Sequence, residues 1–255
     1  MSELGHERIG PGADRIVLLH GFTQSRDVWR DVAEHIVADL PTTHCLLVDL
    51  PGHGESSSVS ADLTTAARLL TELGGPSTYV GYSLGGRVVL QAMVDHPHAV
   101  QRAVVVSATA GIDDANDRQQ RATADDALAE RLERIGIDAF LDEWLAQPIF
   151  RDLPVDSAQL ATRRKNTVTG LADSLRRCSQ GRQYPLWHAL AQARQPLLAV
   201  AGSRDAKYVA LARRLATTAP QGTLRIVDGA GHSVVLERPS DLADEIVYWI
   251  TNPSA

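Results

Sequence analysis

The stretch Gly81-Tyr82-Ser83-Leu84-Gly85 decides the fold of this chain of 255 residues. A β-type run at residues 77–80 precedes it, and apolar residues at helical spacing follow it until His96-Pro97. A serine framed by glycines at such a junction is typical of a tight strand-to-helix turn that lifts a nucleophilic hydroxyl above a sheet. Small residues are needed because the strained turn brings the flanking backbone close. An incidental serine in a glycine-rich turn is the alternative, but both flanking patterns favour the nucleophile.

The rest of the chain alternates between two kinds of segment. Continuous apolar runs, as in strands covered on both faces, occupy residues 15–20, 45–49, 79–82, 102–106, 196–201 and 223–227. Helical patterns occupy residues 28–40, 63–73, 84–96, 209–217 and 242–250. This alternation predicts an α/β protein with a mostly parallel sheet flanked by helices. Together with the serine turn it predicts the α/β-hydrolase fold.

One long stretch lacks this alternation of strand and helix patterns. From residue 110 to residue 193 no convincing strand pattern occurs, and helix-forming composition dominates, as at residues 125–132 and 139–144. Prolines and glycines divide the stretch into short segments, at Pro148, Pro154, Gly170, Gly181 and Pro185. We expect an inserted helical cap, or lid, at 110–193 and a hydrolase core at 1–109 and 194–255. A separate domain is the alternative, but the strand pattern that resumes at Pro196 favours an insertion.

Charge and composition argue against several classes of protein. The net charge of −6 argues against nucleic acid as a partner. The apolar runs are too short to span a membrane, and the polar first ten residues lack the apolar stretch of a signal peptide. Cys45 and Cys178 form neither a metal-binding spacing nor a disulfide framework. We therefore expect a cytoplasmic protein without a metal site, either a monomer or a small homo-oligomer.

The candidate catalytic residues follow the order serine, acid, histidine. Ser83 needs a histidine to take its proton and a carboxylate to orient that histidine. Asp205 and His232 each come just after a predicted strand, where side chains of a parallel sheet converge on a crevice. Asp228 is the rival acid, but its place four residues before His232 is more typical of a turn. The predicted triad is therefore Ser83, Asp205 and His232.

An oxyanion hole requires two backbone donors beside the nucleophile. The N–H of Leu84 directly follows Ser83, and the N–H of Phe22 lies in the loop after the first apolar run. We expect His20 to brace that loop, and we assign no chemistry to His53 in the Pro- and Gly-rich turn at residues 49–56.

Several cations are candidates for binding an anion. Arg87 lies one helical turn after Ser83, and a cation so close to a crevice needs an anionic partner, either a substrate carboxylate or an Asp or Glu of the chain. Arg118 and Arg121 stand near the start of the cap. Residues 163–182 contain six basic residues and one acid, an excess of five positive charges that a solvated helix face explains equally well. Trp144 is a candidate pocket residue, although a buried cap tryptophan is the simpler interpretation.

These motifs together resemble the 2-succinyl-6-hydroxy-2,4-cyclohexadiene-1-carboxylate synthase family, MenH, over nearly the whole chain. The resemblance rests on Leu19–Ser25 with Trp29, Asp49–Gly54, Gly81–Arg87, Arg118 and Arg121 ahead of Asp125, Trp144 with Gln147–Phe150, Gly202–Lys207, Gly231-His232 and Leu236–Pro239. The most particular of these are Arg87 directly after the elbow glycines, the stretch 144–150 and the stretch 205–207. The acidic segment 112–117 departs from what an anionic pocket would favour, and residues 163–166 match only loosely.

The resemblance implies a lyase of menaquinone biosynthesis that eliminates pyruvate from a small anionic metabolite without cofactor or metal. That metabolite would be 2-succinyl-5-enolpyruvyl-6-hydroxy-3-cyclohexene-1-carboxylate, whose carboxylates would be bound by Arg87 and Arg121, with Trp144 and Tyr82 also contacting it. Two other functions stay open. A serine hydrolase of an ester or carbon–carbon bond would share the triad, and a non-catalytic ligand-binding module would share the fold.

Overall fold

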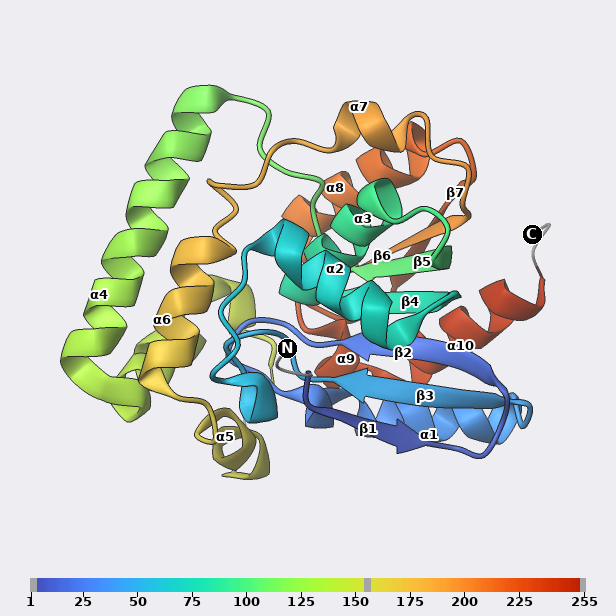
Figure 1. Cartoon of the computed structure of the whole chain (residues 1–255), viewed down its shortest axis with the longest axis horizontal. Helices are drawn as coiled ribbons and strands as arrows, with labels where there is room; N and C mark the ends of the chain where they lie inside the picture. Colours follow the sequence, from blue (N-terminus) through green and yellow to red (C-terminus); the bar gives the residue numbers. More distant parts are fainter. Residues whose placement is uncertain (1–3, 154–156, 253–255) are drawn as a thin grey trace.

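The computed structural model describes residues 4–153 and 157–252. Within these ranges seven strands form one sheet in the order β1-β3-β2-β4-β5-β6-β7 (Figure 1). Their bounds are β1 His6–Ile9, β2 Asp14–Leu19, β3 Thr43–Val48, β4 Ser77–Tyr82, β5 Val100–Val106, β6 Leu197–Gly202 and β7 Gly222–Val227. Strands β2 to β7 are parallel to their neighbours, and β1 alone pairs antiparallel, with β3. The predicted α/β architecture, a mostly parallel sheet flanked by helices, is confirmed.

Strand β1 has no counterpart among the predicted strands. Its sequence His-Glu-Arg-Ile contains a single apolar residue, and its side chains alternate between exposed and half-buried positions. A strand at the edge of a sheet has one neighbour and solvent on its other side, so it needs no continuous apolar run. The sequence of β1 therefore lacks the pattern of a buried strand.

Helices cover both faces of the sheet (Figure 1). On one face lie α2 Leu63–Gly74, α3 Leu84–Asp95 and α8 Ala206–Thr218, and on the other lie α1 Arg30–Asp39 and α10 Pro239–Thr251. Neighbouring residues of one strand pack into different cores, as Val17 and Leu19 face α2 and α3 while Ile16 and Leu18 face α1 and α10. Successive side chains of a strand point to opposite faces, and helices cover both faces of this sheet. Every position therefore takes an apolar residue, which explains the continuous apolar runs in the sequence.

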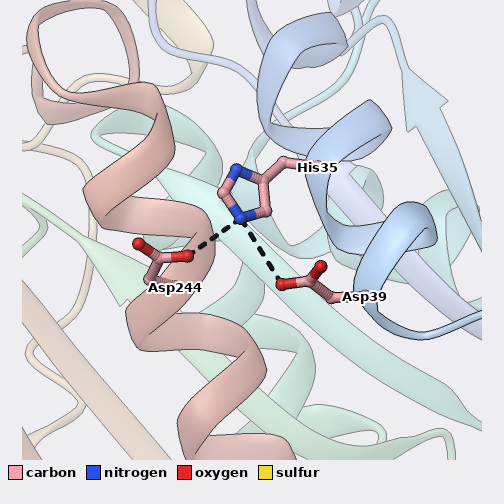
Figure 2. Close-up of side chains that lie close together, drawn as sticks. All are labelled: His35, Asp39 and Asp244. Carbon is pink, nitrogen blue, oxygen red and sulfur yellow. Dashed lines mark ion pairs between the residues drawn. The ribbon is translucent and has the colours of Figure 1, made fainter.

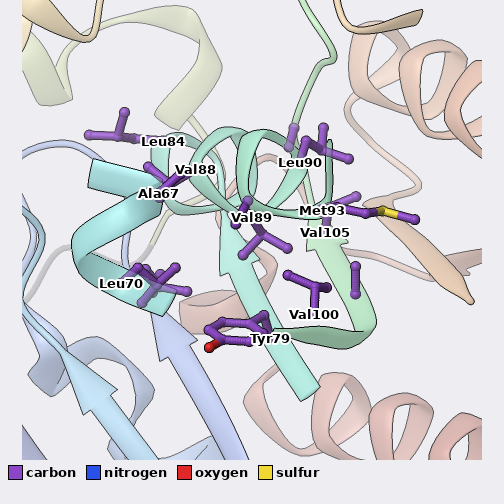
Figure 3. Close-up of a cluster of buried hydrophobic side chains, with 14 of the residues drawn as sticks. Ala67, Leu70, Tyr79, Leu84, Val88, Val89, Leu90, Met93, Val100 and Val105 are labelled. Carbon is purple, nitrogen blue, oxygen red and sulfur yellow. The ribbon is translucent and has the colours of Figure 1, made fainter. Parts of the chain in front are cut away.

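The core beneath α3 fixes the position of the serine turn (Figure 3). Val88 and Val89 of α3 pack with Leu70 of α2 and with Tyr79 of β4, and all four side chains are buried. Each fully buried apolar side chain of this size contributes about 1.5–3 kcal/mol of burial free energy. The first turn of α3, which follows Ser83 directly, is therefore held on a rigid base.

The cap consists of α4 Ala115–Leu145, α5 Ser157–Arg163 and α6 Val168–Arg177, which lie together at one end of the molecule (Figure 1, left). No strand occurs between β5 and β6 in the part of the chain that the structure describes. Helix α4 is longer than the predicted segments, with a break at Gly136, where φ is 78°. Leu132, Phe140 and Leu171 form a separate small core between α4 and α6.

Two parts of the predicted cap contact the hydrolase core. Gly170, predicted to end a segment, lies inside α6, where a Cβ atom would come within 2.5 Å of the Gly52 carbonyl oxygen. That glycine therefore permits backbone contact between the cap and the loop after β3. Helix α7, Trp187–Leu190, lies near the end of the predicted cap segment, and its Trp187 and Leu190 side chains pack in the core cluster that also contains α3 and α8. Pro154 lies outside the described residues.

Shorter turns complete the architecture. They are the 3-10 turns η1 Arg26–Trp29, η2 Gly54–Ser56 and η3 Pro148–Phe150 and the single-turn helix α9 Val234–Glu237. At the surface, His35 of α1 lies 2.8 Å from Asp244 of α10 and 3.5 Å from Asp39, which links the two helices (Figure 2). Among the described helices, none has the length and apolar character needed to cross a membrane.

Candidate active site

Ser83 sits in a strained turn between β4 and α3. Its φ of 51° and ψ of −105° lie outside the regions that residues with a side chain ordinarily adopt. A Cβ atom at Gly81 would come within 2.3 Å of the Gly85 carbonyl carbon, and one at Gly85 within 2.3 Å of the Leu19 carbonyl oxygen. These approaches are the close backbone contacts that the glycine spacing predicted.

The three predicted triad side chains meet at the carboxyl end of the sheet. Ser83 Oγ lies 3.3 Å from His232 Nε2, and His232 Nδ1 lies 3.0 Å from Asp205 Oδ2. A carboxylate only accepts hydrogen bonds, so Nδ1 donates to Asp205 and Nε2 is left to accept the Ser83 proton. Asp228, the rival acid, instead accepts a hydrogen bond at 3.1 Å from Ser203, which lies in the loop after β6.

Local structure holds the acid and the histidine in place. Asp205 caps α8 by accepting the backbone N–H of Tyr208 at 3.2 Å. Burial opposes ionisation of Asp205, but the hydrogen bonds from His232 and Tyr208 outweigh it and keep its pKa below the ordinary value. Glu237 of α9 accepts the N–H groups of Gly231 and Ser233 on both sides of His232, at 2.6 and 2.9 Å. Glu237 thus fixes the backbone on both sides of His232, and Asp205 fixes its ring.

The two predicted oxyanion donors border the same pocket as Ser83. Phe22 and Leu84 both line it, and among the described residues neither backbone N–H has a hydrogen-bond acceptor. Gln24 braces the loop after β2 by accepting the N–H of Gly21 at 3.0 Å. Thr23, the residue after Phe22, has a φ of 68°, an uncommon conformation for threonine that turns the loop sharply. Free donors held by a rigid loop suit an oxyanion.

His20 and His53 are buried behind this loop. His20 Nδ1 donates to the Gly21 carbonyl at 2.8 Å, and its Nε2 accepts the Leu50 N–H at 3.0 Å, so the ring braces two loops, as predicted. Burial lowers the pKa of His20 to about 4 and that of His53 to about 3. Both rings are therefore neutral at pH 7, which suits their enclosed position.

A cavity of about 520 Å³ lies above the triad, between the core and the cap. Ser83, Asp205 and His232 line its floor, and Trp144 and Phe150 of the cap line it from the other side. Trp144 stacks on Phe140 with 6.0 Å between ring centroids and contacts Phe22 at 5.0 Å. Trp144 thus belongs both to the cap core and to the pocket.

Tyr82, the predicted substrate contact next to Ser83, lines the cavity but is almost fully buried. Its hydroxyl group lies 2.8 Å from Ser233 Oγ, and its ring lies 5.5 Å from that of His232. Tyr82 thus supports the loop that carries His232, and its aromatic ring forms part of the cavity wall.

Arg87 lines the cavity one helical turn beyond Ser83 and is 5% exposed. Its Nε donates to Gln183 Oε1 at 2.7 Å, and its buried Nη2 has no partner within the described structure. Burial lowers its pKa to about 10, which leaves the guanidinium charged at pH 7. The alternative of an Asp or Glu partner is not seen, because no ion pair to Arg87 occurs among the residues described.

Arg121 and Arg118 have different surroundings from Arg87. Arg121 lines the cavity, but its Nε donates to Asp125 at 2.8 Å and its Nη1 to Gln180 at 3.2 Å. Much of its charge is therefore balanced by the chain itself. Arg118 does not line the cavity and donates to the carbonyl groups of Ile112 and Asp113.

Of the basic cap residues at 163–182, Arg163 alone lines the cavity. It is 3% exposed, donates to the Thr23 hydroxyl group, and has a pKa lowered by burial to about 10. Surface ion pairs engage the other five: Arg164–Asp138, Lys165–Asp27, Arg176–Glu133, Arg177–Asp173 and Arg182–Asp126. The solvated-face interpretation therefore holds for most of this charge excess. The acidic segment 112–117 also points away from the cavity, since Asp113 pairs with Arg214 at 2.5 Å and Asp114 caps α4.

Asn166, which the sequence did not single out, ties the cap to the oxyanion loop. Its Nδ2 donates to the Thr23 carbonyl at 2.8 Å and to the Arg163 carbonyl at 3.0 Å, while its Oδ1 accepts the Gly54 N–H at 2.8 Å. One buried amide thus joins the turn between α5 and α6, the loop after β2 and the loop after β3. A lone asparagine in a turn carries no sequence signal for such a role.

One group of side chains in the described residues has the spacing of metal ligands, namely His35, Asp39 and Asp244. It lies on the outer surface between α1 and α10, where the two carboxylates are 50% and 64% exposed (Figure 2). The histidine is already engaged in ion pairs with them. Exposed acidic groups of this kind are common without a metal, and this group is separate from the cavity.

Comparison with known proteins places this geometry in a family. A sequence model of the alpha/beta hydrolase family matches residues 16–245. The chain is 32% identical to a 2-succinyl-6-hydroxy-2,4-cyclohexadiene-1-carboxylate synthase of Serratia proteamaculans, over 94% of this chain and 95% of that protein. It is 33% identical to a synthase of the same name from Yersinia pseudotuberculosis, over 98% of this chain and 90% of that protein.

Solved structures agree on the fold. The structure of MenH from S. aureus superposes with a TM-score of 0.88 at 24% identity, covering 98% of this chain and 99% of that one. A thermophilic esterase from Thermogutta terrifontis superposes with a TM-score of 0.82 at 22% identity, covering 99% and 94%. The chain is therefore an enzyme of the alpha/beta hydrolase family and belongs, within it, to the 2-succinyl-6-hydroxy-2,4-cyclohexadiene-1-carboxylate synthases.

Proposed function

We propose that this enzyme eliminates pyruvate from 2-succinyl-5-enolpyruvyl-6-hydroxy-3-cyclohexene-1-carboxylate in menaquinone biosynthesis, forming 2-succinyl-6-hydroxy-2,4-cyclohexadiene-1-carboxylate. One observation carries the proposal. The cavity that holds the Ser83 hydroxyl also holds Arg87, a buried cation to which no carboxylate of the described chain is paired. A buried charge of this kind is stabilised by an anionic ligand. The names of the relatives at 32–33% identity support the same reaction.

The substrate carboxylates match the cations of the cavity. Arg87 reaches the cavity from core helix α3 and Arg163 reaches it from the cap, and both side chains are buried. The exposed Lys207 also lines it, next to Asp205. Arg121 contributes less because Asp125 already accepts from it. Guanidinium groups bind carboxylates in bidentate fashion, which would fix the orientation of the ring above Ser83.

Proton removal starts the reaction. His232, oriented by Asp205, takes the Ser83 hydroxyl proton, and the serine oxygen removes the ring proton beside the succinyl ketone. The electrons of that C–H bond form an enolate, whose oxygen accepts the N–H groups of Phe22 and Leu84. When the enolate carbonyl re-forms, the electrons shift through the ring alkene and break the carbon–oxygen bond to the enolpyruvyl group. The His232 imidazolium returns its proton to that leaving group, which becomes pyruvate.

The proposal is tested by incubating the purified enzyme with this substrate. Pyruvate and the conjugated diene should appear in equal amounts, with pyruvate followed by a coupled lactate dehydrogenase assay and the diene by its ultraviolet absorbance. The same preparation is offered p-nitrophenyl esters as a control for serine hydrolase chemistry. Rapid ester cleavage with an acyl group trapped on Ser83, and no pyruvate from the cyclohexene substrate, would replace the elimination by hydrolysis.

A further inference from the structure

The side chain that orients Arg87 is a neutral amide. Gln183 lies in the segment that returns from the cap to α7, and it is 4% exposed. Its Oε1 accepts Arg87 Nε at 2.7 Å, and its buried Nε2 has no partner within the described residues. Arg87 Nη2 is likewise buried and unpartnered there. Two unsatisfied donor groups therefore flank a single hydrogen bond, at the edge of the cavity.

A neutral acceptor and a charged one have different effects on a buried cation. A glutamine oxygen fixes the direction of the guanidinium but leaves its net charge at +1. A carboxylate in the same place would fix it equally well and would also neutralise it, so a ligand carboxylate would have to compete with it. The neighbouring Arg121 shows the second arrangement, because it donates to Asp125.

We propose that Gln183 is a positioning residue: it aims Arg87 at the cavity while it keeps the Arg87 charge available for a substrate carboxylate. The inference rests on the proposed function, in which Arg87 binds that carboxylate. It extends that function because Gln183, a residue outside the cavity lining, would then influence how tightly the site binds the substrate carboxylate. The unpartnered Nη2 of Arg87, which lines the cavity, is the donor that a bound anion would satisfy.

Two variants of nearly equal size separate charge from hydrogen bonding. Gln183→Glu keeps and strengthens the hydrogen bond to Arg87, whereas Gln183→Met removes it and leaves the cation unpaired. We expect Gln183→Glu to raise KM by about tenfold or more with kcat changed much less. We expect Gln183→Met to raise KM less than Gln183→Glu does. A purely structural hydrogen bond predicts the reverse order, since glutamate preserves it.

Thermal unfolding gives the opposite ranking of the same variants. Gln183→Glu supplies a counter-charge to a buried guanidinium, so its Tm should be at least that of Gln183→Met. Gln192→Glu, which adds a negative charge at an exposed position bonded to His188, serves as the control and should change neither KM nor Tm noticeably. A Gln183→Glu enzyme with the KM of the unsubstituted enzyme, or a lower KM than Gln183→Met, would overturn the inference.

Titration with succinate separates this inference from the proposed reaction. Succinate carries two carboxylates and needs no turnover, so its binding by calorimetry reports on the cations of the cavity, and a difference between the Gln183 variants reports on the Arg87 charge. The unsubstituted enzyme and Gln183→Met should bind succinate, and Gln183→Glu should bind it about tenfold more weakly or not detectably. If pyruvate release fails but this order holds, the substrate assignment is wrong and the role of Gln183 stands. If the unsubstituted enzyme does not bind succinate, the role of Gln183 is wrong.

Discussion

Single residues decide how the cavity is charged. Arg87 and Arg163 are both buried in its wall, and each is oriented by a neutral group, an amide oxygen or a hydroxyl group. Burial lowers the pKa of each to about 10, so both remain charged at pH 7. Neither guanidinium is paired with a carboxylate among the described residues, and maintaining two such charges is costly for the free enzyme. An anionic substrate would pair with these charges and relieve that cost. The affinity for the substrate therefore depends on the two arginines having no other anionic partner.

Replacing Arg87 tests this coupling. Arg87→Ala should raise KM and lower kcat/KM by an amount equivalent to about 2–5 kcal/mol, because a desolvated charge pair with the substrate is lost. The matched control is Arg176→Ala, which removes an arginine from an exposed ion pair with Glu133. That change should leave kcat/KM nearly unaltered. Steady-state pyruvate release measures both, and equal effects of the two substitutions would contradict a role for Arg87 in binding.

At the scale of elements, the cap and the oxyanion loop are linked. Thr23 is held twice, at its hydroxyl group by Arg163 at the end of α5 and at its carbonyl group by Asn166 in the turn between α5 and α6. Thr23 follows Phe22, whose N–H is one of the two proposed oxyanion donors. A displaced cap would therefore move one donor and not the other, which α3 carries.

Asn166→Ala should lower kcat by about tenfold or more with a smaller change in KM, because a misplaced oxyanion donor acts on the transition state. Thr167→Ala is the matched control one residue away. It removes the N-cap of α6, where Thr167 accepts the Gly170 N–H at 3.0 Å, and should cost about 1 kcal/mol of stability with kcat retained. Pyruvate release and thermal unfolding measure the two quantities. A fall in kcat of the same size in both variants would reduce Asn166 to a structural residue.

The elements themselves were largely predictable, for a physical reason. Strands covered on both faces must be apolar at every position, and helices such as α2 and α10 must keep an apolar stripe, so both leave a pattern in the sequence. Edge strand β1 leaves none because solvent covers much of it. Gly170 was misinterpreted because sequence does not distinguish a glycine that ends a helix from one that permits close packing.

The site was predictable where chemistry fixes the spacing. The positions of Ser83, Asp205 and His232 follow from the strand ends, and the structure brings them within hydrogen-bonding distance. Arg163 could not be separated from its basic neighbours, because the fold of the cap decides which of them points inward. Gln183 lies in an irregular segment with no periodicity, so its bond to Arg87 becomes visible only in three dimensions.

The whole molecule should lose stability in mild acid. His20 and His53 have folded-state pKa values of about 4 and about 3, below the 6.5 of an exposed histidine, because burial disfavours the charged ring. Below pH 6.5 the unfolded chain binds these protons and the folded chain does not. Each histidine therefore lowers the free energy of unfolding by about 1.4 kcal/mol per pH unit as the pH falls. The His20 contribution levels off near pH 4.

Urea unfolding between pH 6 and pH 4.5 checks this expectation. His53→Gln should reduce the slope of unfolding free energy against pH by about one proton, or about 1.4 kcal/mol per unit. The control, Gln192→Ala, replaces an exposed side chain that does not titrate in this range and should leave the slope unchanged. An unaltered slope in His53→Gln would mean that this ring is protonated in the folded enzyme, contrary to its enclosed position.

The central claim is that Ser83 removes the proton that starts the elimination. Pyruvate release by Ser83→Ala, measured on enzyme that retains the unfolding temperature and succinate affinity of the unsubstituted form, tests it most directly. The account predicts a fall in kcat of about a thousandfold or more, because binding survives while the base is gone. Turnover within about tenfold of the unsubstituted enzyme would remove Ser83 from the reaction and contradict the account.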